Sequence, residues 1–227
     1  MKLSIVIPIY NERETLLKIL EKVEGADTLG LEKEVILVDD GSIDGTRDVL
    51  RTIENKYSVI YHPKNQGKGA ALKNGFKAAT GDFILVQDAD LEYSPQNYPQ
   101  LLRPVLENKA DVVFGSRNLK KNPTDNLPFY LGRRLTNLFL NLLCGSKLTD
   151  YWTCYKVFKT PVIKNLELES NRFDIEVEMT IKIIKKGYKI LEVPIDYFPR
   201  DAKAGKKIKP KDGLIAIWKT VKYRFGL

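Results

Sequence analysis

The sequence contains little cysteine and histidine: two cysteines, Cys144 and Cys154, and one histidine, His62, among 227 residues. Two cysteines cannot form the disulfide framework of a small secreted protein, and their spacing matches no zinc-binding pattern. The chain also lacks the roughly 18 to 20 consecutive apolar residues that a membrane-spanning helix needs. Its first apolar run, residues 3–9, is short and leads directly into charged residues, unlike a signal peptide. We therefore expect reduced thiols, no zinc site and no spanning segment.

Internal repeats and linkers are also absent, so we expect one domain over residues 1–212 with a dependent C-terminal helix over residues 213–227. Lysine and arginine outnumber aspartate and glutamate by 37 to 29, which gives a net charge of +8. Much of this excess lies in residues 200–211, which could simply form a solvated face. The aliphatic and aromatic side chains among cations in residues 213–227 instead favour an amphipathic helix at an anionic membrane surface.

Short apolar segments alternate with helical patterns through the first half of the chain. We expect strands at residues 3–9, 34–38, 58–61, 83–87 and 111–114, and helices at residues 13–23, 44–55, 67–79 and 95–107. This order predicts a mostly parallel, Rossmann-like central sheet flanked by helices. Further along we expect an apolar helix at residues 130–143, a strand at 154–158 and a helix at 174–186. The strand-like segment 189–198 contains Pro194, which predicts an edge strand or a bent pair of strands instead of a central strand.

Acidic residues follow two of the expected strands where each strand ends. Asp39 and Asp40 follow the second strand, and Asp88, Asp90 and Glu92 follow the fourth. Open α/β sheets bind ligands beyond the carboxyl ends of their strands. Neighbouring carboxylates repel one another unless a cation offsets their charge. Oxygen ligands without histidine or cysteine suit Mg²⁺ or Mn²⁺, so we expect the last three residues to bind such a cation; a solvated loop is the alternative.

Five motifs in this order resemble the family-2 glycosyltransferases. They are IVIPIYNE, VDDGSIDGT, KNQGKGAALKNGF, VQDADLEY and FGSR, which lie within residues 5–117. Three later segments, LTDYWTCYKVFK, EVPIDYFPR and GKKIKPKDG, resemble the branch that includes dolichyl-phosphate mannose synthases and bacterial polyprenyl-phosphate sugar synthases. The resemblance implies a GT-A fold and an inverting transfer of a hexose, from GDP-mannose or UDP-glucose, to a polyprenyl (dolichyl or undecaprenyl) phosphate.

The resemblance also implies which side chains bind the donor. The nucleotide-sugar pocket would be lined by Pro8, Tyr10, Glu12, Val38, Asp39, Asp40, Asp88, Ala89, Asp90, Arg200 and Lys206. The metal would be held by Asp88 and Asp90, with Glu92 as a third ligand at a position where mannose synthases often carry glutamine. In some mannose synthases a lysine follows the equivalent of Phe173, but here Asp174 follows it, which counts against assigning mannose in particular.

Three residues carry the expectations for the acceptor. Arg117 and Arg133 match the arginines that meet the acceptor phosphate, and Asp90, Arg117 and Asp150 are the expected catalytic residues. Asp150 could equally orient the acceptor or cap a turn. A lipid phosphate is already ionised and needs no general base, which agrees with the absence of a catalytic histidine. Arg133 in an apolar helix favours a membrane interface over a protein core, so we expect attachment at the cytoplasmic face of a membrane.

Other functions remain as alternatives. A glycosyltransferase that acts on a soluble glycan or protein would share the same motifs, whereas the Gln-x-x-Arg-Trp signature of processive synthases is absent. A nucleotidyltransferase would open with a glycine-rich phosphate loop, and this chain opens with Pro-x-Tyr-Asn-Glu. A basic nucleic-acid-binding protein is disfavoured because no recognition signature is present, and we expect no nucleic-acid partner. Oligomeric state is not legible from the sequence.

Overall fold

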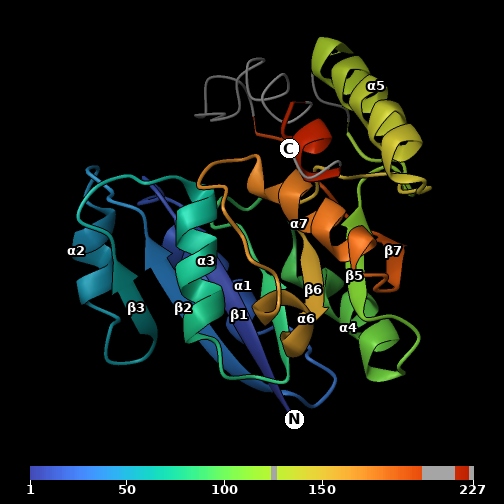
Figure 1. The fold of residues 1–227 in the computed structure, drawn as a ribbon. Coiled ribbons are helices and arrows are strands. Elements are labelled where there is room, and N and C mark those ends of the chain that lie inside the picture. Colours follow the sequence, from blue (N-terminus) through green and yellow to red (C-terminus); the bar gives the residue numbers. More distant parts are fainter. Residues whose placement is uncertain (124–126, 201–217, 225–227) are drawn as a thin grey trace.

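The computed structural model describes residues 1–123, 127–200 and 218–224. Its framework is a seven-stranded sheet with the order β3-β2-β1-β4-β6-β5-β7 (Figure 1). The strands are β1 (Lys2–Ile9), β2 (Glu32–Asp39), β3 (Ser58–Tyr61), β4 (Phe83–Val86), β5 (Val112–Ser116), β6 (Lys156–Lys159) and β7 (Ile190–Pro194). Neighbouring strands pair in parallel except for β6, which is antiparallel to both β4 and β5. The mostly parallel sheet expected from the sequence is therefore confirmed.

The central strand β1 is apolar on both of its faces. Ile5 and Ile7 belong to one buried cluster and Val6 to another, because successive side chains of a strand point to opposite faces. All three side chains are completely buried. A sheet of this kind must be covered on both sides, which explains the short uniformly apolar strands of the sequence.

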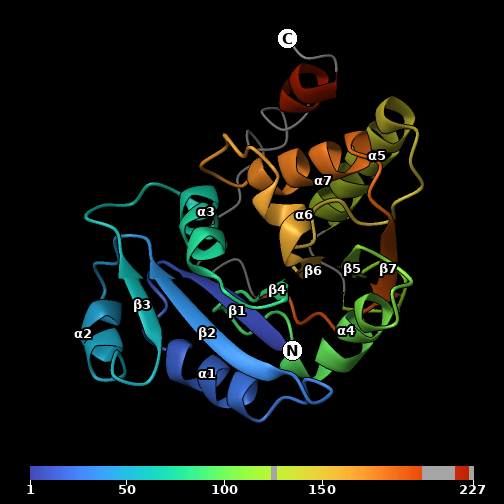
Figure 2. The same ribbon diagram turned by 60° about the horizontal axis from the view of Figure 1, so that its bottom comes forward.

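Helices cover both faces of the sheet. They are α1 (Leu16–Glu24), α2 (Thr46–Arg51), α3 (Lys68–Ala78), α4 (Tyr98–Leu106) with the preceding 3-10 turn η1 (Pro95–Asn97), α5 (Leu127–Cys144), α6 (Thr160–Lys164) and α7 (Ile175–Lys185). Figure 2 shows α1 and α3 on opposite sides of β1 and β2. The buried side chains of α1 and α4 join the cluster of Ile5. Apolar side chains of α3 and α6 join the cluster of Val6, as do Ile175, Met179 and Ile183 of α7.

The helix α5 lies apart from these two layers, beside α7 (Figure 1). A third small cluster joins Leu140 of α5 to Val177 and Ile181 of α7 and to Tyr223. Residues 218–224 are helical, and the rest of the amphipathic helix predicted over residues 213–227 lies outside the described residues. Among the described helices, none has both the length and the apolar character required to cross a membrane.

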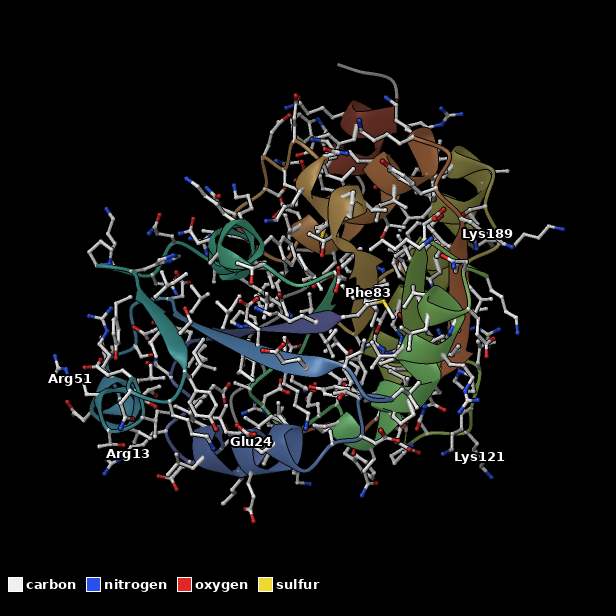
Figure 3. The ribbon with its side chains drawn as sticks, turned by 90° about the horizontal axis from the view of Figure 1, so that it is seen from below. Arg13, Glu24, Arg51, Phe83, Lys121 and Lys189 are labelled. Atoms are coloured by element: carbon white, nitrogen blue, oxygen red, sulfur yellow. The ribbon has the colours of Figure 1, made fainter. Side chains whose placement is uncertain are left out.

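The strand β7 forms one edge of the sheet, as Pro194 predicted. Several elements differ from the expectations. The helix α1 begins at Leu16 instead of residue 13, and the short helix α6 was not predicted. The helix α2 covers only Thr46–Arg51 of the expected residues 44–55, and β7 ends at Pro194 instead of residue 198. Figure 3 looks at the amino ends of the parallel strands, where Phe83 begins β4 and charged side chains such as Arg51 and Lys189 project outward at the rim.

Candidate functional site

The sheet brings the expected site residues to one edge. The strands β1, β2 and β4 are parallel to one another. The strand β5 runs in the same direction as β4, because β6 lies between them and is antiparallel to both. The carboxyl ends of these four parallel strands therefore lie at the same end of the molecule, opposite the N-terminus (Figure 1). The sequence motifs that follow these strands, far apart along the chain, meet there.

Arg200 joins two of these strand ends. Its guanidinium Nη2 lies 2.9 Å from Glu12 Oε1, after β1, and 3.1 Å from Asp90 Oδ2, after β4. Both carboxylates are largely buried, with side-chain exposures of 6% and 21%. The structure thus brings Arg200 together with two other residues of the expected nucleotide-sugar pocket. Lys206, the other expected cation, lies outside the described residues.

Glu92 holds the segment that carries Arg200. Its Oε2 accepts a hydrogen bond from the Tyr197 hydroxyl at 3.0 Å, and its Oε1 accepts one from the Arg200 backbone N–H at 2.9 Å. Its backbone carbonyl accepts a third from the N–H of Phe198 at 2.9 Å. Glu92 therefore fastens the chain after β7 to the loop after β4, a role that its position in the sequence did not predict.

The oxygen ligands expected for a divalent cation do not converge as a set of three. Within the part of the chain that the structure describes, no group of three His, Cys, Asp or Glu side chains has a metal-binding arrangement. Asp88 and Asp90 still fit Mg²⁺ or Mn²⁺, because Mg²⁺ is commonly held by one or two carboxylates together with substrate phosphates. Both carboxylate oxygens of Glu92 accept hydrogen bonds within the chain. Both oxygens of Asp90 also have partners, the Glu92 N–H at 3.0 Å and Arg200 at 3.1 Å.

A chain of buried charges extends from Asp88 into the protein. Lys68 Nζ, at the start of α3, lies 2.6 Å from Asp88 Oδ1 and 3.6 Å from Glu176 Oε1 on α7. The other oxygen of Glu176 pairs with Lys156 on β6, whose side chain is fully buried. Burial lowers the pKa of Lys68, but neighbouring groups, chiefly the Asp88 carboxylate together with Glu176, outweigh burial and hold that pKa above its ordinary value. Lys68 therefore stays charged beside Asp88.

Lys68 is brought to this place by a close approach of two loops. Gly67 precedes it with a φ of 104°, and a Cβ atom at this glycine would lie 2.3 Å from the carbonyl oxygen of Asn171. No other residue type fits this space, and the positive φ also favours glycine. The glycine-rich motif around Lys68 is thus explained by packing of the α3 amino end against the segment before α7.

The two aspartates at the carboxyl end of β2 bind groups of the chain itself. Asp40 accepts hydrogen bonds from the backbone N–H groups of Gln66 and Gly67, both at 2.8 Å, and lies 2.8 Å from His62 Nδ1. Asp39 pairs with Arg47 Nε at 2.7 Å and accepts from the Ser42 N–H. In this structure these carboxylates shape the loops around the expected nucleotide pocket.

The remaining expected pocket residues differ in exposure. Val38 is completely buried in the cluster of Val6, and Ala89 is 3% exposed, so only their backbone atoms could meet a ligand. Pro8 and Tyr10 are partly exposed beyond the centre of β1 and can offer side-chain contacts.

Arg117, Asp150 and Arg133 form a second group at the same edge. Arg117 donates to both oxygens of Asp150, from Nε at 2.7 Å and from Nη2 at 2.8 Å. Burial would raise the pKa of Asp150, but the charge and hydrogen bonds of Arg117, together with the charge of Arg133, outweigh burial and keep this pKa below its ordinary value. Arg133 Nη2 lies 3.5 Å from Asn118 Oδ1. This geometry favours the orienting role of Asp150, because the carboxylate is fully buried and fixes Arg117.

Glu192 on β7 holds the backbone beside Asp150 and was not predicted from the sequence as a site residue. Its carboxylate accepts hydrogen bonds from the Thr149 N–H at 2.7 Å, the Thr149 hydroxyl at 3.0 Å and the Asp150 N–H at 3.0 Å. Burial raises the pKa of Glu192 above its ordinary value. A charged residue inside the otherwise apolar strand β7 was the signal that could have revealed it.

Tyr197 connects the acidic loop to the arginine group. Its hydroxyl donates to Glu92, and its ring lies 5.2 Å from the guanidinium carbon of Arg117. A cation over an aromatic ring at this distance is a favourable contact. Tyr197 therefore links the two groups of charged side chains.

Comparison with known proteins agrees with this arrangement. A family model described as glycosyl transferase family 2 matches residues 4–167. The chain belongs to this glycosyltransferase family. Dolichol-phosphate mannosyltransferase of Pyrococcus furiosus is 34% identical over 219 residues, which are 93% of this chain and 60% of that protein. Undecaprenyl-phosphate mannosyltransferase of Micrococcus luteus is 29% identical over 250 residues, and the match covers 100% of this chain and 100% of that protein. The chain thus spans about three fifths of the Pyrococcus family-2 relative.

Solved structures confirm the expected GT-A fold. Glucosyl-3-phosphoglycerate synthase of Mycobacterium tuberculosis matches with a TM-score of 0.77 and 21% identity, over 100% of this chain and 81% of that one. The same synthase has been crystallised with Mn²⁺, UDP and glucosyl-3-phosphoglycerate, and that structure matches with a TM-score of 0.74. At this identity the likeness shows the fold of the family-2 chain and not its substrate.

Proposed function

We propose that this family-2 glycosyltransferase transfers a hexose, with inversion, from a nucleoside diphosphate sugar to a polyprenyl phosphate. The observation that carries the proposal is Tyr197, which touches Glu92 beside the donor carboxylates and Arg117 in the arginine group. A donor diphosphate and an acceptor phosphate can therefore lie side by side. The names of the Pyrococcus and Micrococcus relatives, both mannosyltransferases of lipid phosphates, support this substrate class and favour mannose.

The two groups of charged side chains, the proposed donor and acceptor halves of the site, suit the two steps of such a transfer. The acceptor phosphate, held by Arg117 and Arg133, attacks the anomeric carbon as an ionised oxygen, and the configuration inverts. The departing nucleoside diphosphate gains negative charge, which Arg200 is placed to stabilise. A divalent cation held by Asp88 and Asp90 would supply further electrostatic stabilisation of the diphosphate when bound. Asp150 orients Arg117 and moves no proton in this scheme.

We further propose that the family-2 chain acts at a membrane surface, on the cytoplasmic side. Four leucines of α5 recur at helical spacing and are 49%, 68%, 68% and 82% exposed, namely Leu131, Leu135, Leu138 and Leu142. Trp218 is 62% exposed, and the neighbouring Arg224 donates to the Leu143 carbonyl at the end of α5. An apolar stripe flanked by arginines and an aromatic ring fits the boundary between acyl chains and anionic headgroups. Cys144 and Cys154 are free thiols, which suits a reducing compartment.

The substrate proposal is tested with a donor panel. Purified chain with Mn²⁺ or Mg²⁺ is incubated with GDP-mannose or UDP-glucose and a short polyprenyl phosphate, and the products are measured by mass spectrometry. We expect one lipid-linked hexose and release of the nucleoside diphosphate. Transfer only to a water-soluble phosphate acceptor would contradict the lipid assignment, and release of pyrophosphate would contradict sugar transfer itself.

A further inference from the structure

Four buried charges alternate in sign between the donor loop and the interior. They run from Asp88 through Lys68 and Glu176 to Lys156, with side-chain exposures of 14%, 11%, 3% and 0%. Two carboxylates and two ammonium groups cancel in net charge. Only the Asp88 end belongs to the acidic loop after β4, because Glu176 lies on α7 and Lys156 on β6.

Burying these four charges costs free energy of desolvation, which suggests that the arrangement serves a function at its exposed end. Removing paired charges from water often costs as much as their mutual attraction returns. Lys156 alone could neutralise Glu176, with which it forms the closest contact of the four. Lys68 adds a second cation to Glu176 and points its ammonium group at Asp88 Oδ1, 2.6 Å away. The arrangement therefore holds a positive charge against a carboxylate of the donor loop.

We propose that Lys68 is an internal counter-ion and positioning residue for Asp88. It fixes one oxygen of this carboxylate and lowers its affinity for a free divalent cation, so that the cation binds together with the donor diphosphate. Arg200 acts in the same direction on Asp90, from which it lies 3.1 Å. This inference rests on the proposed metal-dependent sugar transfer and adds to it which residue sets the affinity for the metal.

The counter-ion role predicts effects of opposite sign for two neighbouring residues. Lys68→Met leaves Asp88, Glu176 and Lys156 with a net charge of −1, which attracts a divalent cation. Glu176→Gln leaves Asp88, Lys68 and Lys156 with a net charge of +1, which repels the cation. Lys68→Arg keeps the charge and serves as the conservative variant. Loss of packing alone would weaken metal binding in all three variants.

The test is direct binding of Mn²⁺ to the full chain, measured by electron paramagnetic resonance with and without GDP or UDP. Without nucleotide, we expect Lys68→Met to bind Mn²⁺ roughly tenfold more tightly than the unaltered chain, and Glu176→Gln to bind more weakly by a similar factor. Lys68→Arg should bind like the unaltered chain. A matched control is Lys182→Met, which removes a cation 2.7 Å from Glu178 on α7 and should leave Mn²⁺ binding unchanged.

Equal Mn²⁺ affinity in the unaltered chain and Lys68→Met would overturn the counter-ion role. Shifts in the same direction for Lys68→Met and Glu176→Gln would also overturn it, because they indicate a structural role. Failure of the unaltered chain to bind Mn²⁺ even with nucleotide would reject both this inference and the metal-dependent step. Opposite shifts without any transfer to lipid phosphate would support the counter-ion and reject only the proposed acceptor.

Discussion

The strand β1 and the helix α5 are both rich in aliphatic residues, yet they lie in opposite surroundings. Ile5, Val6 and Ile7 of β1 are completely buried between two layers of helices. Leu138 and Leu142 of α5 are 68% and 82% exposed. Apolar residues therefore serve two purposes here. In β1 they build the sheet whose end carries the carboxylates that we propose bind the donor, and in α5 they form an outer surface beside the arginine group.

The donor half should show the largest effect of a single change. We expect Asp90→Ala to lower transfer by roughly 10²–10³-fold, the usual loss when one group that stabilises transition-state charge is removed. The measurement is the initial rate of lipid-linked sugar formation across a Mn²⁺ titration. Asp48→Ala, an exposed carboxylate on α2, is the control and should retain full activity. Full activity of Asp90→Ala would contradict the proposed role of the acidic loop after β4 in binding the donor.

The acceptor half should respond through a different kinetic constant. Arg117→Lys keeps the positive charge but loses the bidentate hydrogen bonds to Asp150. We therefore expect kcat/KM for the lipid phosphate to fall about tenfold to hundredfold. Nucleotide affinity, measured by calorimetry, should change by less than about twofold, since Arg200 and the carboxylates remain in place. An equal loss of nucleotide affinity would mean that the two halves are not separable.

The exposed leucines give a sharper test of the contrast between β1 and α5. We expect the double variant Leu135→Glu, Leu138→Glu to bind vesicles that contain anionic lipid about tenfold or more weakly. Two apolar contacts with the acyl chains are lost, and the two added negative charges are repelled by the anionic headgroups. Thermal stability should change little, whereas a Leu→Ala change in the buried core costs about 2–5 kcal/mol. Leu17→Glu, at a 53% exposed position on α1, is the matched control and should bind vesicles normally.

The smallest expected effect concerns acid stability. The pKa of Asp150 is lowered in the folded chain, because Arg117 outweighs the opposing effect of burial. A lowered pKa stabilises the fold above the ordinary aspartate value of about 3.9, and this contribution disappears as the pH falls through the folded-state pKa. We therefore expect the difference in free energy of unfolding between the unaltered chain and Asp150→Asn to be larger at pH 7 than at pH 3, measured by urea denaturation. A difference that stays constant with pH would contradict the ion pair.

Much of the sheet could be predicted because its strands are short, apolar and bounded by helices. The place of β6 could not, since the alternation of side chains is the same for a parallel and an antiparallel strand. Arg200 and Arg117 were expected in the site from motif positions. Lys68 and Glu176 were missed because their contact depends on how closely α3 approaches α7, which only the fold determines.

The expected third metal ligand illustrates the same limit. The spacing of Asp88, Asp90 and Glu92 predicted a common ligand set, but alternate residues of an irregular loop need not face the same way. In the structure Glu92 turns toward Tyr197 and the backbone of Arg200. Its predicted role at the metal stays a prediction, and its observed role is to fasten the segment that follows β7.

Tyr197 has a consequence for how the two substrates influence each other. Its ring supports the guanidinium of Arg117, and its hydroxyl is bound by the carboxylate that also anchors Arg200. If the proposed donor shifts Arg200 when it binds, Glu92 and Tyr197 connect that shift to Arg117. Thermodynamic reciprocity then requires the proposed lipid phosphate to change donor affinity by the same factor as the donor changes lipid affinity. In that case the two substrates, when both are bound, alter each other's affinity through one aromatic side chain.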